Sequence, residues 1–94
     1  MTICSFADKR TEAFFKSGSC PAQWKTMAKV AARKLDMVDA ATMPSDLRSP
    51  PGNRLEALRG DRKGHYSIRI NDQWRVCFRW SSEGPADVEI IDYH

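Results

Sequence analysis

Long apolar runs are missing from this 94-residue chain, and no stretch approaches the roughly 20 apolar residues that a membrane-spanning helix needs. Asp8 lies close to the N-terminus and no apolar stretch of signal length surrounds it, so this segment does not resemble a secretory signal. The two absences argue against a membrane protein, and they make the cytoplasm the expected location.

Cysteine and histidine are scarce. Cys4, Cys20 and Cys77 are odd in number, widely spaced and free of any C-x-x-C pair, which argues against a disulfide framework and against a zinc site. We expect three plain thiols, buried or at the surface. Since His65 and His94 are the two histidines of the sequence, we expect no metal site.

Glycine-rich phosphate loops are also missing. The five glycines fit neither G-x-G-x-x-G nor G-x-x-x-x-G-K. No local motif indicates hydrolysis by a serine, a cysteine or a pair of carboxylates. We therefore expect no bound cofactor.

The composition is that of a globular protein, with 41% hydrophobic and 29% charged residues. A chain of this length forms one modest core, so we expect a single domain over residues 1–94. The net charge is +3, and residues 54–79 hold seven basic side chains against three acidic ones, a local charge of +4. This basic excess permits nucleic-acid binding without requiring it.

The first half of the sequence predicts helices. Residues 3–6 suggest a short strand, and residues 8–15 a short helix that ends near Gly18. Apolar residues then recur at the spacing of one helix face, which predicts an amphipathic helix over residues 22–41. They are Trp24, Met27, Ala28, Ala31, Leu35 and Val38.

The second half predicts a sheet. The segment SDLRSPPGN, residues 45–53, is a connector, and apolar residues after it alternate with a period of two. We expect strands over residues 65–70, 74–80 and 86–92. A three-residue loop over 71–73 gives a hairpin register in which all apolar residues of the first two strands share one face.

That register gives the sheet a basic face away from the core. It places Arg69 opposite Arg75 and His65 opposite Arg79, so negative charge is expected nearby, and Glu89 offers some. Two interpretations remain open. The arginines are neutralised on a solvated or protein-binding surface, or they form a phosphate-binding groove through forked hydrogen bonds.

The end of the sequence offers groups suited to metal-independent RNA cleavage. This reaction needs a base for the 2′-hydroxyl proton, an acid for the leaving 5′-oxygen and cations for the phosphate. A histidine such as His94 exists in both protonation states near neutral pH. Tyr93 offers a hydrogen bond or a proton, and Asp92 can orient a neighbour. Each residue also has a competing structural interpretation. His94 would be a frayed terminal residue, Tyr93 would pack at the rim of the domain, and Asp92 would be a carboxylate that ends the strand.

Residues 53–80 and the terminal VEIIDYH resemble the HigB group of toxins in the RelE/ParE toxin–antitoxin superfamily. The combination that carries the resemblance is L-x-G-D-R-x-G, a W-R-hydrophobic strand and a terminal D-Y-H. The resemblance implies an α/β (α+β) fold with N-terminal helices packed on a twisted, mainly antiparallel sheet. It also implies a toxin that enters the ribosomal A site and cleaves messenger RNA there.

The resemblance also implies roles for single residues. Arg59 would contact phosphate, Arg75 would stabilise transition-state charge, and His94 would act as general acid or base with Asp92 and Tyr93 in support. The remaining basic residues of the segment are expected to bind RNA phosphates; they are Arg62, Lys63, Arg69 and Arg79.

One candidate catalytic position departs from the family pattern. Glu56 stands where other HigB proteins often carry a histidine. A carboxylate is a possible base, but the ordinary pKa of glutamate, about 4.3, is poorly matched to neutral pH. Its negative charge would also lie beside a phosphate. We therefore expect a slower or milder toxin.

The expected partners are a helix-turn-helix antitoxin of the HigA type, the ribosomal A site with its messenger RNA, and operator DNA through the antitoxin complex alone. No membrane partner is expected. Two other functions stay open: non-catalytic inhibition of DNA gyrase, as in ParE-type relatives, and a role as co-repressor only. The D-Y-H terminus and the W-R strand favour the nuclease, because a binding module does not need a proton-transfer histidine.

Overall fold

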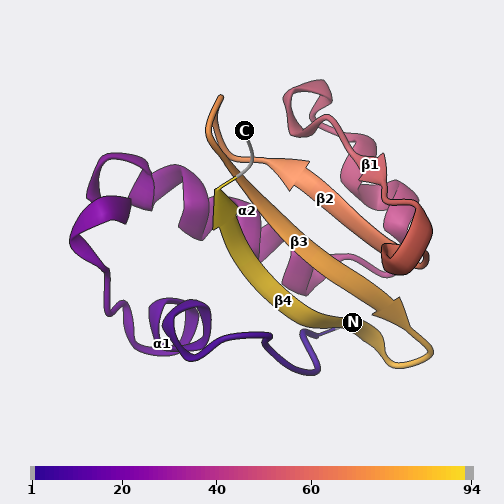
Figure 1. Cartoon of the computed structure of the whole chain (residues 1–94), viewed down its shortest axis with the longest axis horizontal. Helices are drawn as coiled ribbons and strands as arrows, with labels where there is room; N and C mark the ends of the chain where they lie inside the picture. The colour runs from indigo at the N-terminus through magenta and orange to yellow at the C-terminus, as the bar shows by residue number, and fades with distance from the viewer. Residues whose placement is uncertain (1, 93–94) are drawn as a thin grey trace.

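Helices and strands form two packed layers in the computed structural model, which describes residues 2–92. In the helical layer, α2 packs against β3 and α1 against β4 (Figure 1). The elements in chain order are α1 (Lys9–Ser17), the 3₁₀ helix η1 (Ala22–Met27), α2 (Ala28–Ala40), the 3₁₀ helices η2 (Pro44–Arg48) and η3 (Pro51–Asn53), β1 (Glu56–Ala57), the 3₁₀ helix η4 (Gly60–Arg62), β2 (His65–Arg69), β3 (Trp74–Ser81) and β4 (Gly84–Asp92).

The first helix matches its prediction, with two further residues at its end. Asp8 caps α1, since its carboxylate accepts a hydrogen bond of 2.7 Å from the Thr11 N–H. Gly18 follows the helix in the left-handed conformation, with φ of 77°, and its N–H donates to the Phe14 carbonyl.

Residues 3–6 do not form the regular strand that was predicted. Their backbone runs beside the edge of β4, but the pairing amounts to one parallel bridge between Phe6 and Val88. Three hydrogen bonds support it: Cys4 N–H to the Pro85 carbonyl, Val88 N–H to the Ser5 carbonyl, and Ala7 N–H to the Val88 carbonyl. The segment turns into the α1 cap at Asp8, which leaves too few residues for a longer ladder.

The prediction of one continuous helix over residues 22–41 is wrong for its first six residues. Residues 22–27 form η1, and α2 begins at Ala28, after Met27 adopts φ of −114° and ψ of 7°. A 3₁₀ helix repeats every three residues, which places Trp24 and Met27 on the same side. Both side chains are buried in the core.

The sheet has the strand order β1-β2-β3-β4, and all its neighbours are antiparallel. The predicted hairpin register is confirmed, because Ile68 pairs with Val76 and Arg69 with Arg75. The sequence did not indicate β1, whose two residues are too few for an alternating pattern to appear. Glu56 of β1 pairs with Ser67, so β1 adds an outer edge beside β2.

A β-bulge interrupts the pairing of β3 with β4. Cys77 pairs with Glu89 and Arg79 with Ala86, so Asp87 and Val88 together oppose Phe78. Asp87 has φ of 51°, a left-handed conformation that aspartate adopts more readily than most residues.

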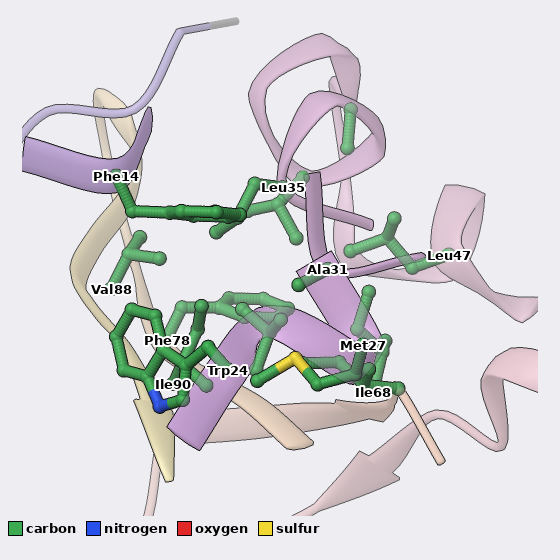
Figure 2. Packing of buried hydrophobic residues seen from close by; sticks show 14 residues of the cluster. Phe14, Trp24, Met27, Ala31, Leu35, Leu47, Ile68, Phe78, Val88 and Ile90 are labelled. Carbon is green, nitrogen blue, oxygen red and sulfur yellow. The ribbon is translucent and has the colours of Figure 1, made fainter. Parts of the chain in front are cut away.

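Side chains from both layers meet in the core (Figure 2). Ala31 and Leu35 of α2 are buried together with Phe78 of β3 and Ile90 of β4. The Phe14 and Trp24 rings meet edge to face, with centroids 5.7 Å apart.

The connector is more ordered than its composition indicated. Residues 44–53 contain η2, a cis Ser49–Pro50 peptide bond and η3. Asn53 is fully buried, accepts a hydrogen bond from the Lys34 ammonium and donates to the Leu47 carbonyl at 3.1 Å. No helix in the described part of the chain is long and apolar enough to cross a bilayer.

Candidate functional site

The candidate site lies on the sheet face that points away from α1 and α2, which we call the open face. Side chains alternate along each strand, so the residues that share this face follow from the register. They are Glu56, His65, Ser67, Arg69, Arg75, Cys77, Arg79, Glu89 and Ile91.

Arg75, the second residue of β3, lies on the open face and is held by several contacts. Its Nε donates a hydrogen bond of 2.9 Å to the Ser67 hydroxyl, and its Nη2 donates one of 2.6 Å to the Arg54 carbonyl. The Glu56 carboxylate lies 3.9 Å from the same Nη2. Arg75 is 7% exposed, so its guanidinium is held in an almost fully enclosed position.

The negative charge that the basic strands required is present. Arg69 binds Asp72 at 2.5 Å, Arg79 binds Asp87 at 3.0 Å, and the bulge at Asp87 supplies the second of these carboxylates. These pairs are open to solvent, and exposed ion pairs contribute about 0–1 kcal/mol each. The carboxylates neutralise the positive charge of the arginines on β2 and β3. Because each pair contributes so little free energy, a competing anion can replace the carboxylate easily.

The loop between β1 and β2 crosses the open face. Arg62 of this loop lies 3.5 Å from Glu89 of β4, the strand farthest from β1. The crossing covers Cys77, the partner of Glu89 on β3, and burial raises the pKa of the Cys77 thiol to about 11. Cys77 is therefore an uncharged, structural thiol at neutral pH.

Two further predicted cations, Arg59 and Lys63, come from the same loop. Both are exposed, and neither forms an ion pair with any residue from 2 to 92. The loop thus adds two cations to the four arginines with carboxylate partners.

The end of β4 carries the remaining predicted groups. Asp92 pairs with Trp74, the residue before Arg75, and its carboxylate accepts a hydrogen bond of 3.1 Å from the Gln73 side chain. By strand alternation Asp92 belongs to the opposite side of the sheet from Ile91, the partner of Arg75. Tyr93 and His94 lie outside the described residues.

The sequence interpretation did not identify the groups that hold Arg75. Ser67 was already aligned on the open face by the predicted register, and a hydroxyl one strand away from an arginine was a usable signal. The Arg54 carbonyl was not predictable, because it depends on a left-handed backbone with φ of 46° at Arg54. Across residues 2–92, no cluster of three or more His, Cys, Asp or Glu side chains is arranged to hold a metal ion.

Two solved structures share this architecture. The YoeB–YefM complex from Staphylococcus aureus matches with a TM-score of 0.61 at 20% identity, over 100% of this chain and 97% of that one. The YoeB/ParE toxin from Agrobacterium tumefaciens matches with a TM-score of 0.53 at 20% identity, over 100% of this chain and 99% of that one. Helices packed on one side of an antiparallel sheet therefore form a RelE-like α+β fold.

Sequence relatives narrow the class. Toxin HigB-1 of Vibrio cholerae is 52% identical over 62 residues, 66% of this chain and 64% of that protein. Endoribonuclease HigB of Proteus vulgaris is 30% identical over 95 residues, 98% of this chain and 99% of that protein. The family model of the HigB RelE-like toxin of type II toxin–antitoxin systems matches residues 4–94, and the chain belongs to this HigB-like toxin family.

Proposed function

We propose that this toxin is a ribosome-dependent endoribonuclease that cleaves messenger RNA in the ribosomal A site and thereby inhibits translation. The observation that carries the proposal is the fixed guanidinium of Arg75, held by Ser67 and the Arg54 carbonyl beside Glu56. A preorganised cation stabilises developing charge without reorganising during the reaction. The full-length relative named Endoribonuclease HigB supports the choice of chemistry.

In the proposed reaction the substrate supplies the nucleophile, its own 2′-hydroxyl. A general base removes the hydroxyl proton, a general acid protonates the leaving 5′-oxygen, and His94 takes one of these two roles. Tyr93 supports the RNA or the proton transfer. Asp92, on the opposite side of the sheet from Arg75, orients a neighbour at the end of β4. Glu56 is the second candidate base. No step of this scheme calls for a metal ion.

The other cations bind the RNA backbone. Arg69 and Arg79 exchange their exposed carboxylates, Asp72 and Asp87, for phosphate oxygens, because such pairs contribute little and phosphate accepts forked hydrogen bonds. Three cations of the β1–β2 loop extend the contact along the RNA backbone; they are Arg59, Arg62 and Lys63.

The proposed partners follow from the same role. The A site with its messenger RNA is the place of action, which puts the toxin in the cytoplasm. A helix-turn-helix antitoxin of the HigA type holds it inactive, and operator DNA is bound through that complex. One solved structural neighbour was itself captured as a toxin complex, YoeB–YefM.

Primer extension on messenger RNA in a purified translation system tests the proposal. The wild-type protein is expected to create new 5′ ends that require ribosomes, and His94→Ala is expected to reduce their formation by about 10²- to 10⁴-fold, the usual contribution of a general acid or base. Lys29→Ala, an exposed change on α2, is the control and should cleave like the wild type.

Intact messenger RNA at high toxin concentration would refute ribosomal cleavage. Gyrase supercoiling would then be assayed, since inhibition of that enzyme is the competing function. Cleavage that persists without ribosomes would refute the ribosome dependence alone.

A further inference from the structure

A second surface feature lies on the other side of β1 from Glu56. It is a pocket of about 350 Å³ between the connector and the outer edge of the sheet, where the connector passes beside β1 (Figure 1). Its lining comes from η2, η3, the residues that follow them, β1 and β2: Arg48, Pro51, Arg54, Leu55, Ala57 and Tyr66. None of the residues proposed for cleavage lines it.

The charge of this pocket is unbalanced. Arg48 and Arg54 are both exposed, and neither guanidinium forms an ion pair or a hydrogen bond within the described chain. In contrast, the three arginines of the open face and Arg62 of the β1–β2 loop all have carboxylate partners. Two unpaired guanidinium groups around one hollow favour an anion with several oxygen acceptors.

An aromatic ring forms another wall. The Tyr66 ring stacks on the buried Phe78 ring, with centroids 6.1 Å apart and planes inclined by 23°. The packing fixes the orientation of Tyr66, while its hydroxyl has no hydrogen-bond partner among residues 2–92. A fixed ring at the rim of an arginine-lined pocket suits a planar base, since RNA-binding sites combine arginine with aromatic stacking.

The backbone at Arg54 is strained, and this residue contributes both to the open face and to the pocket. Arg54 has φ of 46° and ψ of 58°, a left-handed conformation that costs a non-glycine residue about 1–2 kcal/mol. In this conformation its carbonyl accepts the hydrogen bond from Arg75 while its side chain lines the pocket. Strain of this kind clusters at functional sites.

We infer that this pocket binds one nucleotide of RNA, with its phosphate on Arg48 and Arg54 and its base against Tyr66, Pro51 and Leu55. The inference extends the proposed function by giving the toxin a second RNA contact on the far side of the sheet edge from Arg75. The volume lies near the lower end of the range of ligand pockets, about 300–1,000 Å³, which suits a single nucleotide. Messenger RNA beyond the cleaved site and ribosomal RNA are the two sources of such a nucleotide.

Titration of the isotope-labelled full chain with adenosine 5′-monophosphate, followed by backbone amide NMR, tests the pocket without any cleavage assay. Shifts are expected at Leu55, Ala57 and Tyr66, with tighter binding than for inorganic phosphate. The double variant Arg48→Gln/Arg54→Gln should weaken binding about tenfold, which corresponds to about 1.4 kcal/mol. Arg33→Gln is the matched control, because Arg33 is exposed on α2 and also lacks an ion pair with residues 2–92.

Three results would overturn the inference. They are shifts confined to the open face, equal affinity for phosphate and nucleotide, and displacement of the nucleotide by an acidic peptide that binds more tightly. If Arg54→Gln disturbs folding, Arg48→Gln alone still reports on the pocket. Tyr66→Leu should remove the preference for nucleotide over phosphate while leaving phosphate affinity unchanged.

The source of the nucleotide is tested separately. In the purified translation system, Arg48→Gln should raise the ribosome concentration needed for half-maximal cleavage, and vacant ribosomes should retain less of the variant if ribosomal RNA fills the pocket. Equal retention of variant and wild type by vacant ribosomes would assign the contact to messenger RNA. A wild-type toxin that binds nucleotide here but never cleaves would refute the proposed function and leave the pocket standing.

Discussion

At the scale of single residues, the pair of Glu56 and Arg75 sets the electrostatics of the candidate site. The Glu56 side chain is 51% exposed, and its carboxylate lies 3.9 Å from the Arg75 guanidinium. That negative charge reduces the attraction between Arg75 and a phosphate. A slower or milder toxin therefore stays the prediction for a carboxylate at this position.

We predict that Glu56→His increases the rate of messenger RNA cleavage by at least about tenfold, because histidine titrates near neutral pH and serves as a base there. The measurement is the single-turnover cleavage rate on programmed ribosomes. Glu56→Gln separates the two causes, since it removes the charge without supplying a base. An unchanged rate in Glu56→His would contradict the idea that Glu56 limits the enzyme.

At the scale of elements, the connector before β1 depends on one buried contact. The Lys34 ammonium donates to the Asn53 side chain, and burial, with Arg33 and Arg69 nearby, lowers the pKa of Lys34. Asn53 in turn donates to the Leu47 carbonyl, so it holds η2 and η3 against α2. Arg54 comes directly after Asn53 in the chain, and η2 and η3 carry part of the pocket lining. The Asn53 contact therefore helps to position both the Arg54 carbonyl and the pocket.

Asn53→Ala should destabilise the protein by about 2–3 kcal/mol, because it leaves the Lys34 ammonium and the Leu47 carbonyl buried without their partner. Urea unfolding measures the loss. The double variant Lys34→Met/Asn53→Leu should lose less than the single one, since both polar partners are removed together. A double variant less stable than Asn53→Ala would show that the contact itself, and not the orphaned group, dominates.

The elements also show which parts of the fold the sequence specifies. Strict alternation in residues 65–80 predicted the β2–β3 register correctly, because one wrong step would have buried Arg69 or Arg75 on the core side. Helical spacing over residues 22–41 did not distinguish a 3₁₀ start from an α-helix, since Trp24 and Met27 fit both periods.

The candidate site was predictable to the extent that strands carry it. Arg69, Arg75 and Arg79 were placed on one face by alternation, and the structure confirms that placement. The Arg54 carbonyl and the pocket beside it were not predictable, because backbone angles in an irregular connector create them.

At the scale of the whole molecule, residues near the N-terminus pair with the edge of the last strand, β4. The backbone of residues 3–7 exchanges three hydrogen bonds with β4, the Ser5 hydroxyl accepts one from the Asp87 N–H at the bulge, and the Ile3 N–H donates to Asp39 at the end of α2. The segment therefore covers an edge of the sheet and joins it to the helical layer. Uncovered edges of this kind pair readily with other chains.

Removal of residues 2–7 should lower the free energy of unfolding by about 3–5 kcal/mol, since roughly five hydrogen bonds at about 1 kcal/mol each are lost. The truncated protein should also self-associate, because β4 would then present free backbone groups at the edge. Urea unfolding measures the loss of stability, and sedimentation velocity measures self-association. The control is Ser5→Ala, which removes only the hydroxyl at the bulge. It should lower the free energy of unfolding by about 1 kcal/mol and leave the protein monomeric. A truncated chain as stable and as monomeric as the Ser5→Ala variant would mean that β4 holds its place through β3 and the core alone.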